Sequence, residues 1–425
     1  MIKIYKTTDL SNETIFKRAN QKYDVSAAVS EIIDNVRKFG DKALIDYTRR
    51  FDKSEIEKTE VSEQEIETAY AETDEEFKRI LHTAAQNIRE FHRMQLRDGY
   101  EIKRNNGVIV GQKITPMDSV GLYVPGGTAA YPSTVLMDII PALIAGCKQV
   151  IMVTPPAKDG TVNSAILAAA KVAGITKIYK VGGAQAIAAL AYGTESIPKV
   201  DKIVGPGNAY VAEAKRQVFG VVSIDMIAGP SEIMILSDSR SNPKHLAADL
   251  LSQAEHDKMA SAVLVTDSVD LAQAVSDELE KQIPDLLRCD IARYSIDENG
   301  KIIVTDNLDQ AYDVVNKIAP EHLELSIDDP FEGLKKVKHA GSVFLGRNCP
   351  EALGDYYAGA NHTLPTSGTA KFSSALSVDD FVKKTQYIYY DEKALSDVAA
   401  DVAYFATKEG LTAHAKSAII RTEGK

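Results

Sequence analysis

The sequence predicts an α/β protein with two parallel-sheet units, an N-terminal helical arm and a C-terminal helical tail. After about Gly107, short β-rich runs alternate with alanine-rich segments of helical length, which is typical of parallel sheets covered by helices. The chain has 425 residues, a length that predicts about two or three domains, each able to bury a core. Together these observations predict two α/β units within one chain.

Composition and charge indicate which kinds of molecule the chain is expected to bind. The chain has 49 basic and 60 acidic residues, a formal net charge of −11, and a pI of about 5.4. Binding to a phosphate backbone needs a basic face, so nucleic acid is not an expected partner. The sequence has neither an apolar run of about 18 residues nor a signal peptide, so we expect no membrane span and no secretion. This composition is typical of a cytoplasmic enzyme for small molecules.

The first α/β unit is expected between residues 120 and 218. Short β-rich runs predict strands at 120–124, 149–153, 177–181 and 202–204. The alanine-rich segments predict helices at 134–145, 162–173, 184–192 and 209–218.

The second unit repeats the alternation between residues 233 and 345. Strands are expected at 233–236, 262–266, 322–326 and 341–345, and helices at 243–255, 269–287 and 308–318. Before these units, residues 11–97 are highly charged and carry an apolar stripe at helical spacing, for example Leu81, Ala84 and Ile88. Beyond Asp379 we expect a helical tail.

Four glycine-rich turns occur at or near the ends of predicted strands. Ligands of open parallel sheets bind outside the carboxyl ends of the strands, and glycine lets backbone N–H groups approach an anion. The dinucleotide fingerprint GxGxxG is absent, because Tyr210 stands where its third glycine should be. A nucleotide site and plain tight turns therefore both stay open. The turns are Pro125-Gly126-Gly127-Thr128, Gly182-Gly183-Ala184-Gln185, Gly205-Pro206-Gly207-Asn208 and Gly229-Pro230-Ser231-Glu232.

Several polar residues are candidates for metal binding or proton transfer. Gln253 and His256 are three residues apart and share one helical face. Glu321 and His322 follow Pro320, whose break in the helix lets neighbouring residues serve one site, and a carboxylate beside an imidazole can divide two proton transfers. With Asp355 and His414, Gln253 and His256 make a nitrogen and oxygen set that suits zinc, although spacing alone leaves ordinary packing roles open.

Two further groups of residues are expected to have no part in the chemistry. The cysteines lie far apart and match no zinc or disulfide pattern, so we expect plain thiols at Cys147, Cys289 and Cys349. Surface or capping roles are expected for His82, His92, His245 and His339.

Taken together, these segments resemble the histidinol dehydrogenase family. The matching stretches run in family order from about Val120 to His414: VGLYVPGG, STVLM, KVGGAQAIAALAYGT, KIVGPGNAYVAEAKR, IDMIAGPSE, ADLLSQAEHD, APEHLEL, GDYYAGANHTLPTSGTAKFSS, LSVDDF and EGLTAH. The resemblance implies two Rossmann-like parallel-sheet units in a homodimer with shared active sites. It also implies zinc- and NAD-dependent oxidation of L-histidinol, through L-histidinaldehyde, to L-histidine, the last steps of histidine biosynthesis.

The resemblance also assigns roles to residues. It implies an acid/base pair of Glu321 and His322. It implies one zinc per subunit, held by Gln253, His256, Asp355 and His414. It implies NAD contacts at Tyr123, Gln185 and Asn208. The substrate would contact Ser231, His322 and Glu409 as well as the zinc ligands, and Glu409 and His414 would complete the site of the neighbouring subunit.

The same resemblance implies a division into domains. Residues 1–19 would form the arm, and residues 20–122 with 231–378 a first α/β domain that carries the metal and acid/base residues. Residues 123–230 would form a second α/β domain on the NAD side, and residues 379–425 a tail that reaches the partner subunit.

Two other enzymes remain alternatives. One is a related zinc- and NAD-dependent dehydrogenase of another small polyol. The other is a zinc hydrolase in which Glu321 acts as the base for water. A non-catalytic binding module would leave a complete acid, base and metal set without a use.

Overall fold

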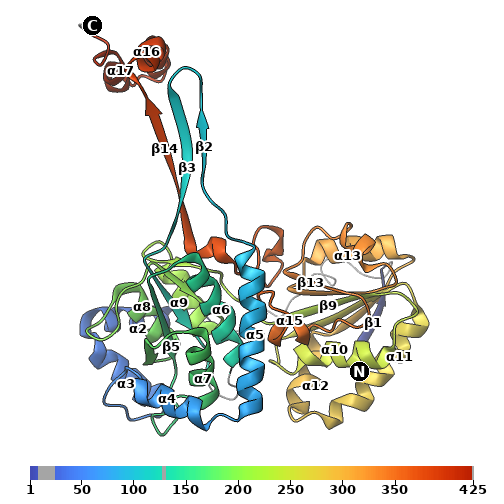
Figure 1. The fold of residues 1–425 in the computed structure, drawn as a ribbon. Helices are drawn as coiled ribbons and strands as arrows, with labels where there is room; N and C mark the ends of the chain where they lie inside the picture. The colour runs from blue at the N-terminus through green and yellow to red at the C-terminus, as the bar shows by residue number, and fades with distance from the viewer. Residues whose placement is uncertain (8–23, 127–130, 424–425) are drawn as a thin grey trace. The chain divides into compact units, whose positions relative to one another are not determined.

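The computed structural model describes residues 1–7, 24–126 and 131–423. Met1–Gln95 and Met117–Phe381 form one compact unit, which we call the α/β unit. Leu96–Pro116 and Val382–Lys425 form another, which we call the small unit. Figure 1 shows the elements of both. Among the described residues, no helix combines the length and the apolar character needed to cross a membrane.

The first sheet of the α/β unit is parallel and has the strand order β6-β5-β4-β7-β8. Counted along the chain, this order is third, second, first, fourth and fifth, which is the order of Rossmann-like sheets. The order reverses between β4 and β7, and ligands bind at such a switch point. The strands are β4 (Ser119–Tyr123), β5 (Gln149–Thr154), β6 (Ile178–Lys180), β7 (Lys202–Val204) and β8 (Ser223–Ile224).

Helices cover both faces of this sheet. Alternate strand residues such as Ile151 and Val153 enter one core, since successive side chains of a strand point to opposite faces. That core is covered by α2 (Ser26–Phe39), α3 (Asp41–Phe51), α8 (Gly183–Tyr192) and α9 (Ala209–Val218). The other face carries α6 (Pro132–Ala145) and α7 (Ser164–Ala173), against which α4 (Glu63–Glu72) and α5 (Glu75–Arg93) pack (Figure 1).

This packing places part of the N-terminal region differently from the expected domain division. The division groups residues 20–122 with residues 231–378, whereas Val29 and Leu44 belong to the core of the five-stranded sheet. His92, expected at the surface or in a cap, is fully buried in α5, with Nδ1 2.7 Å from Gln95 Oε1. The division as a whole stays a prediction.

The second sheet of the α/β unit is also parallel, with the order β1-β11-β10-β9-β12-β13. Apart from the edge strand β1, the order is again third, second, first, fourth and fifth along the chain. The prediction of an α/β fold with two Rossmann-like parallel sheets is therefore confirmed. The strands are β1 (Lys3–Lys6), β9 (Glu232–Ser237), β10 (Ser261–Thr266), β11 (Lys301–Val304), β12 (His322–Ser326) and β13 (Ser342–Leu345).

This sheet also has a core on each face. Ile233 and Ile235 pack under α10 (Pro243–Ala254), α11 (Val269–Gln282) and α12 (Cys289–Glu298). Met234 and Leu236 face the opposite core, with α13 (Leu308–Ile318), and α14 (Pro330–Leu334) lies beside β12 and β13. The helix expected over 269–287 ends at Gln282, and a 3₁₀ turn, η2 (Ile283–Asp285), follows around Pro284 because proline does not continue a helix. The remaining short elements are α15 (Ala352–Tyr356), η3 (Thr369–Lys371) and η4 (Val378–Phe381).

Two expectations for the ends of the chain need correction. The N-terminal arm begins with strand β1, which pairs with β11, while residues 8–23 lie outside the described residues. The tail beyond Asp379 is not wholly helical, because it begins with the strand β14 (Val382–Tyr390). In the small unit, β14 pairs with β3 (Val108–Pro116), which also pairs with β2 (Tyr100–Lys103), and all these pairings are antiparallel. The helices α16 (Glu392–Lys408) and α17 (Thr412–Ile419) follow.

Candidate functional site

A cavity of about 1140 Å³ lies in the α/β unit, where ends of the two sheets face each other. For the five-stranded sheet these are the carboxyl ends of β4 and β7, at the switch point. For the six-stranded sheet they are the amino ends, because Ser231 precedes β9 and His322 begins β12. The turn at 229–232 therefore does not follow the carboxyl-end rule. The predicted site residues that line the cavity are Asn208, Ser231, Gln253, His256, Glu321, His322 and Asp355.

The backbone of Glu232 holds the predicted acid/base pair. Its N–H donates to Glu321 Oε2 at 2.8 Å, and its carbonyl lies 3.0 Å from His322 Nδ1. A carbonyl oxygen only accepts, so Nδ1 carries the proton and Nε2 of a neutral His322 keeps its lone pair. Ala319, in the left-handed region at φ 54°, turns the chain between α13 and this pair. Glu321 and His322 thus both line the cavity directly after a local break in the chain, as expected, while their shared role stays a prediction.

Burial and charge shift the pKa values of this pair. Burial raises the pKa of Glu321 to about 8, against the opposing effect of His322. Burial alone would lower the pKa of His322, but the carboxylates of Glu321 and Asp355 outweigh it and raise this pKa to about 10. Glu321 Oε2 and His322 Nδ1 lie 3.6 Å apart. The carboxylate of Glu321 and a charged His322 therefore each favour the charged form of the other.

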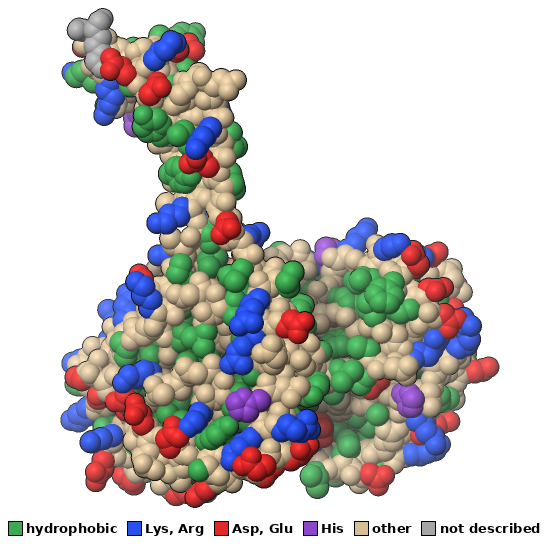
Figure 2. Space-filling view, in the orientation of Figure 1, with side chains coloured by type: hydrophobic (Ala, Val, Ile, Leu, Met, Phe, Trp, Pro, Cys, Tyr) green, Lys and Arg blue, Asp and Glu red, His purple; other side chains and the backbone are tan. Residues whose placement is uncertain are grey.

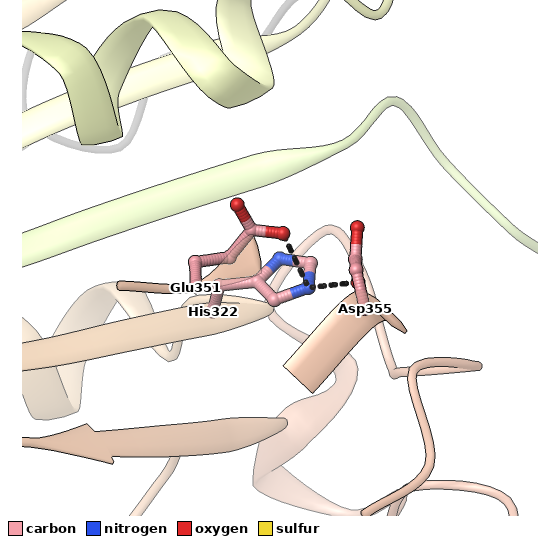
Figure 3. Close-up of side chains that lie close together, drawn as sticks. All are labelled: His322, Glu351 and Asp355. Carbon is pink, nitrogen blue, oxygen red and sulfur yellow. Dashed lines mark ion pairs between the residues drawn. The ribbon is translucent and has the colours of Figure 1, made fainter. Parts of the chain in front are cut away.

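Two further carboxylates face the other nitrogen of the same imidazole (Figure 3). His322 Nε2 lies 3.8 Å from Asp355 Oδ1 and 4.0 Å from Glu351 Oε1. Asp355 Oδ1 is also 3.5 Å from His362 Nδ1. Burial would raise the pKa of Asp355, but its bonds to His322 and His362 lower it instead. Burial and the nearby Asp355 raise the pKa of Glu351 to about 7.

Sequence reasoning missed Glu351 and His362 as residues of this cluster. Glu351 stands four residues before Asp355, at the start of α15, so helical spacing was a signal that could have found it. His362 lies within the polar stretch that also contains Asp355, and its Nε2 is 3.3 Å from Thr134 Oγ1 of α6. Only the fold brings α6 next to this stretch.

The cluster has the features of a cation site. Buried polar atoms without a hydrogen-bond partner include Gln253 Oε1, His322 Nε2 and Glu351 Oε1. One ligand atom from each of His322, Glu351 and Asp355 lies within 4.8 Å of the others. Within the described chain, no lysine or arginine forms an ion pair with these carboxylates. Unsatisfied acceptors beside two carboxylates in one cavity are what a divalent cation would satisfy.

The predicted metal ligands fall into two groups. Gln253 lies in the last turn of α10 and His256 follows the helix, and both line the cavity with Asp355. Burial lowers the pKa of His256, which favours the neutral imidazole that a metal needs. His414 and the predicted substrate residue Glu409 are exposed in the small unit, at the corner between α16 and α17.

The three predicted NAD residues lie around the five-stranded sheet. Asn208 lines the cavity and caps α9, where its Oδ1 accepts from the N–H groups of Tyr210 and Val211 at 3.0 and 3.2 Å. Tyr123 and Gln185 are buried and are not among the residues that line the cavity. The Tyr123 hydroxyl accepts from Gly183 N–H at 3.1 Å, and Gln185 Oε1 has no partner.

Comparison with known proteins decides the family. The family model described as histidinol dehydrogenase matches residues 16–422. The chain is 53% identical over 426 residues to a histidinol dehydrogenase of Clostridium acetobutylicum, covering 99% of each sequence. It is 55% identical over 396 residues to one of Geobacillus kaustophilus, covering 93% of each. The chain belongs to the histidinol dehydrogenase family.

A solved structure agrees with this assignment. The crystal structure of histidinol dehydrogenase from Elizabethkingia anophelis superposes with a TM-score of 0.95 at 39% identity, covering 99% of this chain and 98% of the other. As a member of the histidinol dehydrogenase family, the chain is an NAD-dependent oxidoreductase.

Proposed function

We propose that this chain is a cytoplasmic enzyme that oxidises L-histidinol through L-histidinaldehyde to L-histidine, with two successive hydride transfers to NAD. One observation carries the proposal. Glu321 and His322 face the same cavity as Asp355 and the turn that ends at Asn208. A proton-transfer pair, a candidate cation site and a cofactor turn thus line one cavity.

The residues that would hold zinc are Gln253, His256 and Asp355, with His414 as the fourth ligand. The orphaned Gln253 carbonyl supports this set, and of its members Asp355 also belongs to the cluster with His322 and Glu351. When bound, zinc would hold the imidazole and amino groups of histidinol and so orient the carbinol carbon.

His322 and Glu321 would divide the proton transfers. In its neutral form, His322 would accept the hydroxyl proton at Nε2 while the hydride leaves to NAD. A cation bound beside the carboxylates would favour this form, because it would offset the negative charges that raise the pKa of His322. The aldehyde must first add water, because only its hydrate can lose a second hydride and give an acid. The Glu321 carboxylate would take the proton from that water. Ser231 lines the same cavity and would contact the substrate.

The cofactor would lie along the five-stranded sheet and contact Tyr123, Gln185 and Asn208. Tyr123 ends β4 and Asn208 follows β7, so they stand on the two sides of the switch point. The unpartnered Gln185 Oε1, near the amino end of α8, leaves an acceptor for a hydroxyl or amide of the cofactor.

The active enzyme would be a homodimer in which Glu409 and His414 serve the neighbouring subunit. The small unit exposes large apolar side chains (Figure 2), among them Ile388 at 72%, Tyr404 at 67% and Phe405 at 68%. Surfaces of this kind are typical of protein interfaces.

The test is NAD reduction by histidinol together with metal content, measured before and after chelation. We expect stoichiometric zinc, two NADH per histidinol, loss of activity on chelation and its recovery with zinc. Full activity in metal-free protein would overturn the metal assignment. Oxidation of a polyol in preference to histidinol, or hydrolysis without NAD reduction, would favour one of the alternative enzymes.

The proposed role of Glu321 has a separate test. Glu321→Gln keeps the size of the side chain but cannot take a proton from water. We expect this variant to stall at the aldehyde, with oxidation of added histidinaldehyde strongly impaired. Aldehyde oxidation at the rate of the unaltered protein would refute the role.

A further inference from the structure

Gly205 begins the turn that follows β7 and lines the cavity. Its φ is 111°, in the region that favours glycine. Tyr123 is the last residue of β4. A Cβ on Gly205 would stand 2.1 Å from the Tyr123 carbonyl oxygen and 3.2 Å from Asp138 Oδ2. The backbone of the turn is therefore pressed against the neighbouring strand, at the switch point of the sheet.

A buried ion pair holds both polar groups of this glycine. Gly205 N–H donates to Asp225 Oδ2 at 2.8 Å, and the Gly205 carbonyl accepts from Lys215 Nζ at 2.9 Å. Lys215 and Asp225 also bind each other, and each side chain is only 2% exposed. Asp225 Oδ1 accepts in addition from Met226 N–H at 2.5 Å. These hydrogen bonds join the two side chains to each other and to the backbone of Gly205 and Met226, both of which line the cavity.

The turn is tied to one helix at both of its ends. Lys215 lies on α9 and reaches back to the first residue of the turn, while Asn208, the last residue, caps the start of the same helix. Pro206 between them has a restricted φ. The position of Asn208 relative to the sheet is therefore set by the Lys215–Asp225 pair as well as by the chain itself.

Stability alone is a weak reason for such a pair. A buried ion pair loses its hydration, and well-packed apolar residues in its place are often as stable or more stable. The pair can instead fix the position of the turn. Lys215 donates to the Gly205 carbonyl and Asp225 accepts from the Gly205 N–H, so both side chains hold the same residue.

We propose that Lys215 and Asp225 are positioning residues for the cofactor, acting through the Gly205–Asn208 turn. The inference rests on the proposed function, which gives Asn208 to NAD. Lys215 does not line the cavity, and Asp225 lines it with a carboxylate that is already bound by Gly205, Met226 and Lys215. Loss of the pair should therefore weaken binding of the dinucleotide and leave recognition of histidinol intact.

The experiment compares Lys215→Met and Asp225→Asn with the double variant Lys215→Met/Asp225→Leu. Three quantities are measured on purified full-length protein: the Kd of NADH by fluorescence titration without substrate, the KM values of NAD and of histidinol, and the thermal midpoint. The single variants should lose stability, since each leaves one buried charge unpaired. The double variant should recover most of the thermal midpoint. In all three, the Kd of NADH and the KM of NAD should rise by at least about tenfold, with the KM of histidinol within about twofold.

A second ion pair of the α/β unit offers a matched control. Arg347 Nη2 lies 2.6 and 2.7 Å from the two carboxylate oxygens of Asp238, at the carboxyl end of β9, and neither residue lines the cavity. Arg347→Met should lower the thermal midpoint without changing the Kd of NADH. If it weakens NADH binding as much as Lys215→Met does, the effect is general loosening and the inference is wrong.

The outcomes separate this inference from the proposed function. If the unaltered protein binds NADH and oxidises histidinol while the double variant binds NADH with unchanged affinity, only the inference fails. If the unaltered protein binds no NADH, the proposed function fails and the inference with it. Recovery of stability without recovery of NADH affinity in the double variant supports a positioning role.

Discussion

Asp138 on α6 carries a buried carboxyl group whose raised pKa should make the α/β unit less stable as the pH rises and this group loses its proton. Its side chain is fully buried, its Oδ1 accepts from Thr363 Oγ1 at 2.8 Å, and its Oδ2 has no partner. Burial raises its pKa from 3.8 to about 7. The nearby Asp225 also raises this pKa, while Thr363, His362 and Lys215 oppose the shift.

The sign follows from proton binding. Between about pH 4 and pH 7 the folded protein keeps a proton that the unfolded chain has lost, so the free energy of unfolding falls as the pH rises. A shift of about three pKa units corresponds to about 4 kcal/mol in total, since one unit is about 1.4 kcal/mol. About 2 to 3 kcal/mol of this falls between about pH 5 and pH 8.

Asp138→Asn should remove this dependence. The amide still accepts from Thr363 and has no proton to lose. Urea unfolding of the protein without metal or cofactor, at several pH values between about 5 and 8, measures the effect. The variant should gain about 2 to 3 kcal/mol relative to the unaltered protein across this range. Asp313→Asn, at an exposed position of α13, is the control and should show no such gain. A constant difference between Asp138→Asn and the unaltered protein at every pH would refute the reasoning.

Three further predictions concern backbone strain and thiols. Gly205→Ala should lower the free energy of unfolding by more than about 3 kcal/mol and abolish NADH binding. Gly220 has a similar φ of 103° but no heavy atom within 4 Å of a Cβ, so Gly220→Ala should lower the free energy of unfolding by only about 1 kcal/mol. Equal melting curves for the two variants would contradict the clash at Gly205. Ala319→Val should lower the free energy of unfolding, measured with denaturant, by about 2 kcal/mol or more, because a β-branched residue tolerates a positive φ poorly. Ala319→Gly should keep the free energy of unfolding within about 1 kcal/mol of that of the unaltered protein. Replacing any cysteine with Ala should leave the rate of histidinol oxidation unchanged, and lost activity in a folded variant would show that a thiol takes part; the positions are Cys147, Cys289 and Cys349.

Local pattern was enough to predict most elements of the two parallel sheets. The expected strands at 202–204 and 322–326 and the expected helices at 209–218 and 308–318 match the structure residue for residue. The two helices begin after the capping residues Asn208 and Asn307, and β7 is followed by Gly205, so neighbouring residues set these boundaries. The strands β1 and β14 were missed because their partners, β11 and β3, are remote in sequence. No strand was expected at β2, β3, β8 or β11 either. Most side chains of β14 are also exposed, so it carries no burial pattern.

The candidate site divides in the same way. Helical spacing pointed to Gln253 and His256, and the break at Pro320 pointed to Glu321 and His322. The carboxylate of Glu351 was missed although it stands one helical turn before Asp355, because only the fold brings the start of α15 beside His322 of β12. The roles in zinc, NAD and substrate binding stay predictions until the metal and cofactor are measured.

The sequence by itself determined which segments become strands and helices, because hydrophobic period, glycine turns and capping residues act over a few neighbouring positions. It also determined which groups are available for chemistry. Only the tertiary structure decided that the carboxyl ends of one sheet face the amino ends of the other, and that one backbone residue, Glu232, holds Glu321 and His322 from about ninety positions away. Such contacts depend on strand order and on packing between distant segments. Their free energy is gained only when the whole chain has folded, and so no local pattern records them.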